Sequence, residues 1–309
     1  MIENITLNKL KLEKKLKKSL MVWYEKIIKE TASQIEKGGA YSVMLSVEHK
    51  EDLKNILREH YVRAVEVNMP KGMDKSKNDY VKKLYKEIIE EIESVIFTRG
   101  ESSVDFLFNT ADKRTKRIAL LALTLLGKES EDVISNVELA RTYTNMARQR
   151  FDKKSKTDAI TETNWVSEKT RVKAEKKVSR GLGLVAGSTV MIANEGGDVI
   201  RNIETVRELG KFSRRESIKD LIEDFEELIA EEDLALGVGM VESFGNFFKR
   251  WNTMGDDRVR PTHAFVDQTV ISIDENFEVG AYEMYEPSDD SFGAGAEEIA
   301  NCRCYLTYE

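Results

Sequence analysis

Cysteine is scarce in this chain of 309 residues, and long apolar segments are missing from it. Cys302 and Cys304, the two cysteines, stand one residue apart, where a disulfide would close a strained ring and cross-link almost no chain. The longest apolar run, residues 118–126, is far too short to cross a bilayer, and the first residues lack the pattern of a signal peptide. We therefore expect a soluble protein that is not secreted, has no disulfide scaffold and does not contact membranes.

Proline is also rare, with three in the chain and one in its first two thirds, so little interrupts long helices there. Apolar residues recur at helical spacing near the N-terminus and over residues 80–96, 131–149 and 218–229. Ser217 and Asp220 fit a capping box at the start of the last of these segments. The N-terminal stripe consists of Leu16, Leu20, Trp23, Tyr24, Ile27 and Ile28.

Acidic residues outnumber basic ones, which gives a formal net charge of -7. Nucleic-acid binding usually requires a basic balance, so this charge argues against a generic nucleic-acid binder but leaves local basic patches open. One helical segment has many basic residues and few acidic partners, and it is a candidate for contact with DNA, although solvated basic helices are common. Its residues are Lys169, Arg171, Lys173, Lys176, Lys177 and Arg180.

Glycines gather in residues 181–197, a stretch typical of strands or turns. Their spacing misses GxGxxG by one residue and no GxxxxGK[ST] occurs, so we do not expect nucleotide binding. We divide the chain into a helical region (1–150), a helical connecting region with an insertion near 180–235 (151–250), and a C-terminal domain (251–309).

Beyond Gly255 the sequence becomes turn-rich, β-branched and acidic. Candidate strands cover residues 264–266, 269–273 and 305–308. The expected fold class is therefore α+β, with a long, mainly helical N-terminal region followed by a small β-rich C-terminal domain.

Polar chemistry is concentrated in residues 251–263, which hold an aromatic ring, two carboxylates, two guanidiniums and an imidazole. Because guanidiniums pair with carboxylates in a bidentate fashion, we predict that the Gly-Asp-Asp turn folds its carboxylates back onto Arg258 or Arg260.

The two cysteines face the same way if their segment is extended, since side chains alternate along a strand. With His263 they form an incomplete zinc-binding set, to which Asp257 or Asp267 could add a fourth ligand. Buried thiols and a hydrogen-bonded histidine linking two strands explain the same residues without a metal.

Taken together, the pattern W-x-T-x-x-D-x-R-V-R-x-x-H, followed some forty residues later by N-C-R-C, resembles the C-terminal signature of the phage Mu F-like head morphogenesis proteins. Upstream, residues 159–164 resemble the family's A-R-T-E-T helix motif, with Ile160 and Thr161 in place of the usual Ala-Arg, while residues 240–243 stand at a more usual distance from the tryptophan. The residues that carry the resemblance are Trp251, Thr253, Asp257, Arg258, Val259, Arg260, His263, Asp267, Pro287, Asp289, Glu298, Asn301, Cys302, Arg303 and Cys304.

This resemblance implies a minor head protein of a tailed bacteriophage, a structural component rather than an enzyme. It implies a place in the virion near the portal, a role in head morphogenesis and in DNA packaging or ejection, and the portal protein, other capsid or scaffold proteins and packaged DNA as partners. Gln268 departs from the family, which often has glycine there, and it would be strained in a turn that needs a positive φ.

An alternative follows from the distant link of the family's fold with ADP-ribosyltransferases. In that interpretation Arg258 or Arg260, together with Glu297 or Glu298, would act on NAD. Spacing in the sequence shows neither a nicotinamide pocket nor a glutamate placed against the ribose.

Overall fold

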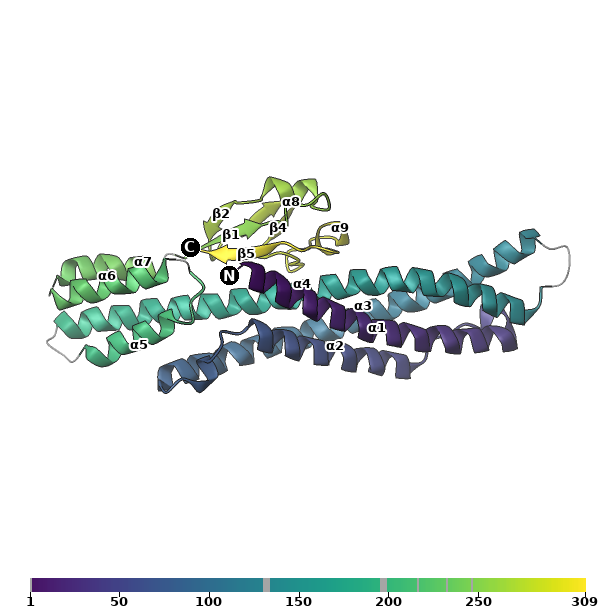
Figure 1. Cartoon of the computed structure of the whole chain (residues 1–309), viewed down its shortest axis with the longest axis horizontal. Coiled ribbons are helices and arrows are strands. Elements are labelled where there is room, and N and C mark those ends of the chain that lie inside the picture. Colours follow the sequence, from purple (N-terminus) through teal and green to yellow (C-terminus); the bar gives the residue numbers. More distant parts are fainter. Residues whose placement is uncertain (1, 130–133, 195–198, 216, 232, 246) are drawn as a thin grey trace. The chain divides into compact units, whose positions relative to one another are not determined.

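The computed structural model describes residues 2–129, 134–194, 199–215, 217–231, 233–245 and 247–309 (Figure 1). Its longer helices are α1 (Ile2–Gly38), α2 (Val47–Asn68), α3 (Asp79–Glu129), α4 (Asn136–Asn194), α5 (Ile200–Gly210), α6 (Ile218–Ala230) and α7 (Leu234–Gly245). Short helices are η1 (Ala40–Ser42), η2 (Met73–Lys75), α8 (Pro261–Phe265) and α9 (Ala296–Ile299), and the strands are β1 (Phe248–Asn252), β2 (Val270–Ser272), β3 (Phe277–Val279), β4 (Tyr282–Met284) and β5 (Tyr305–Tyr308).

The chain divides into two compact units. The first comprises residues 1–64 and 95–163, and the second comprises residues 65–94 and 164–309. Helices α2, α3 and α4 each contribute residues to both units. The regions 1–150, 151–250 and 251–309 are a different division and stay a prediction.

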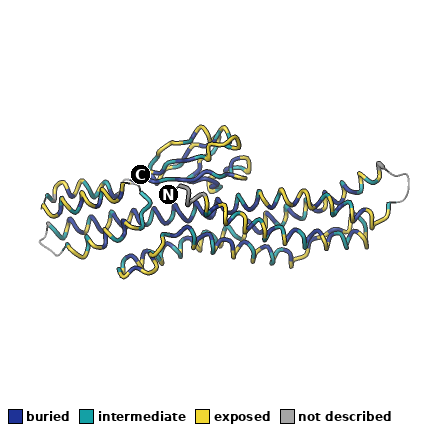
Figure 2. Tube along the Cα trace, in the orientation of Figure 1, coloured by how far each residue is buried: buried dark blue, intermediate teal, exposed yellow. Residues whose placement is uncertain are grey.

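The first unit is a bundle of helices, and Figure 2 marks the buried positions along them. Most of these buried residues are apolar. All six residues of the stripe predicted on α1 are buried, which confirms that helix and its face. Tyr24 of α1 stacks on Phe151 of α4, with ring centroids 4.3 Å apart. The core also holds a polar group: Glu162 of α4 accepts hydrogen bonds from Tyr61 of α2 (2.6 Å) and Ser103 of α3 (3.1 Å).

The second unit combines helices with a small antiparallel sheet in the strand order β2-β1-β5. Trp251 pairs with Leu306 and Arg250 with Val270 in the two ladders. Strands β3 and β4 form a separate hairpin. Long helices followed by a small β-rich segment confirm the expected α+β class.

Two sequence-based assignments are wrong. Residues 181–193 continue α4 instead of forming strands or turns, because Leu182, Ala186 and Val190 extend its buried face at helical spacing. Residues 264–266 are not a strand, since 264 and 265 belong to α8, where Pro261 occupies a first-turn position that favours helix.

Other assignments are confirmed with small changes. The helix predicted over 131–149 begins at Asn136 in α4, while its residues 131–133, like the glycine-rich residues 195–197, lie outside the described residues. The helix predicted over 218–229 is α6, although the Ser217 side chain makes no capping hydrogen bond. Strands β2 and β5 lie where strands were predicted. None of the described helices is long and apolar enough to span a bilayer.

Candidate metal centre in the C-terminal segment

Three short elements bring the aromatic, imidazole and thiol groups of the signature together. Trp251 lies in the central strand β1, His263 in α8, and the two cysteines directly before β5. Trp251 is fully buried and makes an edge-on contact with the His263 ring, at 5.6 Å between centroids and 89° between planes. Its other neighbour is Phe277, at 5.2 Å. The indole therefore fixes the orientation of the imidazole.

His263, Cys302 and Cys304 form a buried cluster of potential metal ligands. His263 Nδ1 lies 3.3 Å from Cys304 Sγ and 3.7 Å from Cys302 Sγ, and all three ligand atoms lie within 4.8 Å of one another. Nitrogen and sulfur ligands of a tetrahedral zinc ion stand about 3.5 Å apart, given metal bonds near 2.0 and 2.3 Å. The spacing of the donor atoms thus fits a small tetrahedral metal ion. Neither cysteine forms a disulfide bond.

The carboxylate of Glu298 lies next to the second ring nitrogen of His263. Glu298 Oε2 lies 3.0 Å from His263 Nε2, without hydrogen-bond geometry, and it accepts a hydrogen bond from Thr262 Oγ1 (2.8 Å). Glu298 is itself buried. Histidines that bind metals commonly have such a carboxylate next to one ring nitrogen, while the other ring nitrogen binds the metal.

Neither Asp257 nor Asp267, the two residues considered as a fourth ligand, belongs to the cluster. Asp267 accepts a hydrogen bond from the backbone N–H of Thr253 (2.7 Å), and Asp257 is exposed and does not join the cluster. A depression of about 10 Å³, lined by the three cluster residues together with Arg260 and Asn301 among others, adjoins the thiols. A volume of about 10–15 Å³ accommodates one water molecule, so the depression suits a water or a single ion.

The cluster also alters the acidity of a thiol. A hydrogen bond from the Cys304 side chain, followed by the hydrogen bond and charge of His263, holds the pKa of Cys302 well below its ordinary value, although burial opposes this. Thiolate is the form that binds metal ions. The site is therefore chemically suited to a soft or borderline cation.

Ion pairs in this segment differ from the prediction. The carboxylate of Asp256 pairs with Arg303 (2.6 Å) rather than with Arg258 or Arg260, because the turn directs it toward the segment that contains the cysteines. The Arg260 guanidinium instead donates to the carbonyl oxygen of Ala300. Arg303 and Arg260 thus connect the segment around residues 256–260 to the segment around residues 300–303. Arg258 is exposed.

Three non-glycine residues of the segment adopt positive φ, namely Gln268 (63°), Ser288 (68°) and Asn301 (59°). Asparagine tolerates a positive φ better than most residues, whereas glutamine has no such preference for it. The turn after Asp267 therefore has the backbone conformation for which glycine is preferred, despite the glutamine at position 268.

The basic helix predicted to contact DNA is engaged within the protein. The expectation of few acidic partners is wrong, because carboxylates from distant segments pair with its lysines and with Arg180, and Arg171 is buried. The pairs are Lys169 with Glu286, Lys173 and Lys177 with Glu91, and Lys176 and Arg180 with Asp274.

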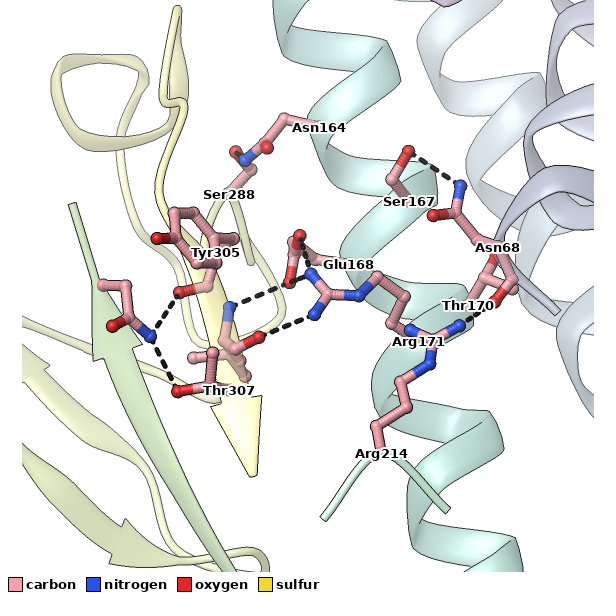
Figure 3. Close-up of polar contacts among 12 residues, drawn as sticks. Asn68, Asn164, Ser167, Glu168, Thr170, Arg171, Arg214, Ser288, Tyr305 and Thr307 are labelled. Carbon is pink, nitrogen blue, oxygen red and sulfur yellow. Dashed lines mark hydrogen bonds and ion pairs between the residues drawn. The ribbon is translucent and has the colours of Figure 1, made fainter. Parts of the chain in front are cut away.

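Arg171 has a specific structural role, shown in Figure 3. It pairs with Glu168 one helical turn earlier (2.9 Å) and donates to the carbonyl oxygen of Leu306 (2.7 Å). Glu168 accepts the Leu306 N–H (3.2 Å). Together the two side chains satisfy both backbone groups of an edge-strand residue, as a neighbouring strand would. Sequence analysis missed Glu168, although its i, i+3 spacing from Arg171 was a signal.

Two further residues that carry the resemblance, Pro287 and Asp289, lie in the interior of the second unit. Asp289 is fully buried and accepts hydrogen bonds from the backbone of Tyr285 and Ser291, and Pro287 beside it is buried. Of the two candidates for the upstream motif, residues 159–164 contain the buried Glu162, whereas Glu242 in the other is exposed. The glutamate of residues 159–164 is therefore part of the packed interior, whereas that of residues 240–243 faces solvent.

No family model, no curated protein and no solved structure matches this chain.

Proposed function

We propose that the chain is a minor head protein of a tailed bacteriophage, a structural component associated with the portal that acts in head morphogenesis. The supporting observation is that the signature residues bind one another instead of lining a large cleft. Arg303 pairs with Asp256, Arg260 binds Ala300, and Trp251 packs on His263. Such cross-bracing suits a rigid surface module that other head proteins contact.

Co-expression with the portal protein of the same genome tests this proposal. The tagged chain is expected to retain the cognate portal through affinity and size-exclusion steps, and not the portal of an unrelated phage. Mass spectrometry of purified virions is expected to detect the chain in low copy. Failure to retain the cognate portal together with absence from virions would reject the assignment.

The alternative, transfer of ADP-ribose from NAD, lacks a supporting observation. Glu298 is buried against His263 and Glu297 accepts a hydrogen bond from Tyr282 (2.6 Å). The depression beside Arg258 and Arg260 measures about 10 Å³, whereas small-molecule pockets are typically about 300–1,000 Å³. Incubation with NAD and mass spectrometry of the chain and its partners distinguishes the two proposals, because any transfer would support the enzyme.

We also propose that His263, Cys302 and Cys304 hold a zinc ion, with a water as the fourth ligand. Protein purified without chelator is expected to contain one zinc per chain by elemental analysis. Cys304→Ser removes a ligand and is expected to abolish stoichiometric zinc, whereas Asp257→Asn, which changes an exposed carboxylate nearby, is expected to retain it. Substoichiometric zinc in the unmodified protein would favour a metal-free hydrogen-bonded cluster.

A further inference from the structure

A groove of about 450 Å³ lies in the first unit between α3 and α4. Five of its seven lining residues are cationic, and Thr110 and Ile118 are the other two. The cationic residues are Lys113, Arg114 and Arg117 of α3 and Arg150 and Lys153 of α4. All are exposed except Arg114, which is partly buried. The groove is therefore lined by positive charge and by no carboxylate.

The cations of the groove are not paired by any residue that the structure describes. Among the described residues, none of the five makes an ion pair or a side-chain hydrogen bond. Nearby carboxylates are engaged with other lysines: Asp112 with Lys116 (2.7 Å), Asp152 with Lys17 (2.8 Å), and Asp158 with Lys154. Within the described part of the chain, no ion pair neutralises the charge of the groove.

The distribution of charge over the chain favours the same surface. The first unit contains 25 lysines and arginines against 19 aspartates and glutamates, a net charge of +6. The second unit contains 23 against 36, a net charge of -13. The first unit is therefore basic although the whole chain is acidic. A polyanion would be attracted to the first unit and repelled by the second.

The dimensions of the groove suit a regular chain of phosphates. Residues 110–118 of α3 extend about 12 Å along the helix axis at about 1.5 Å per residue. One strand of B-DNA carries a phosphate for about every 3.4 Å of helix axis, so the groove is long enough to contact a few consecutive phosphates. Three of the five cations are guanidiniums, whose planar forks bind phosphate oxygens in pairs. The lining has no aromatic ring for base stacking, so binding would be independent of sequence.

We propose that this groove binds the phosphodiester backbone of DNA. Contact with DNA is thereby assigned to cations that no described residue pairs with, in place of the helix 169–180, whose cations are paired or buried. The proposal does not depend on the assignment to a phage head, because DNA binding can be measured with the purified chain alone.

The test compares two variants of the full chain that lose the same charge. The groove variant loses all three guanidiniums of the groove through Arg114→Gln, Arg117→Gln and Arg150→Gln. The α1 variant loses three exposed lysines of the same unit through Lys11→Gln, Lys14→Gln and Lys18→Gln. Fluorescence anisotropy with a short labelled DNA duplex gives the affinity at a series of salt concentrations. Circular dichroism verifies that both variants fold.

The unmodified chain is expected to bind with a slope of log K against log salt of about -3 to -4. The groove variant is expected to lose about tenfold or more in affinity and to reduce the magnitude of the slope by about 2 to 3, while the α1 variant stays close to the unmodified chain. Equal losses in both variants, or no binding by the unmodified chain at low salt, would overturn the proposal. Tighter binding of polyglutamate or of anionic vesicles than of DNA would overturn it as well.

Discussion

Replacing Arg171 by methionine is expected to lower the free energy of unfolding by about 3–5 kcal/mol. The guanidinium is buried and neutralises Glu168, which is fully buried too. Methionine has a similar volume but no charge, so the buried carboxylate of Glu168 would lose the guanidinium that pairs with it, and the carbonyl oxygen of Leu306 would lose its donor. Urea denaturation followed by circular dichroism measures the loss.

Two control variants separate this effect from general sensitivity of α4. Arg180→Met removes an exposed guanidinium that lies 3.4 Å from Asp274, and it is expected to cost under about 1 kcal/mol. Adding Glu168→Gln to Arg171→Met removes the buried charge that has lost the Arg171 guanidinium, and glutamine can still accept the Leu306 N–H, so part of the lost stability is expected to return. A cost below about 1 kcal/mol for Arg171→Met alone would contradict the proposed role of the pair.

Elements with a strong hydrophobic period were predictable from the sequence. The stripe from Leu16 to Ile28 is buried throughout, and α6 begins within a residue of its expected start. In both helices local propensity and tertiary burial favour the same conformation, so the sequence pattern alone suffices.

The glycine-rich part of α4 could not be predicted because tertiary packing opposes the local signal there. Glycine favours turns, but at position 181 a Cβ atom would come within 3.2 Å of a Leu84 side-chain carbon. The small residue therefore permits close approach of α3 to α4, a reason that is visible only once both helices are in place.

The partners of charged residues were the least predictable feature. Lys176 pairs with Asp274 and Lys169 with Glu286, at separations of about a hundred residues, and no rule based on short spacings finds such pairs. The cluster of His263, Cys302 and Cys304 was predictable because its residue types are few and distinctive. The expectation that Asp267 would join it was wrong, since the hydrogen bond from the Thr253 N–H to Asp267 depends on how β1 meets the following turn.

Replacing Trp251 by alanine is expected to cost about 3–5 kcal/mol, the range for deleting a fully buried large aromatic side chain. The indole contacts both Phe277 and His263, so its removal leaves a cavity beside the imidazole and releases the ring that faces the thiols. Cys302 and Cys304 are the two cysteines of the chain and both are buried, so their reaction with a thiol reagent reports on this cluster alone. In protein treated with a chelator, both thiols are expected to react much faster in Trp251→Ala than in the unmodified chain.

Phe265→Ala is the matched control, because that ring lies in the same segment but is 89% exposed. It is expected to change stability by under about 0.5 kcal/mol and to leave the thiols protected. Trp251→Phe keeps a smaller aromatic ring in the core and is expected to fall between the two. If Trp251→Ala destabilised the chain but left the thiols protected, the indole would be a core residue without influence on the cluster, and β5 together with α8 would position the metal ligands unaided.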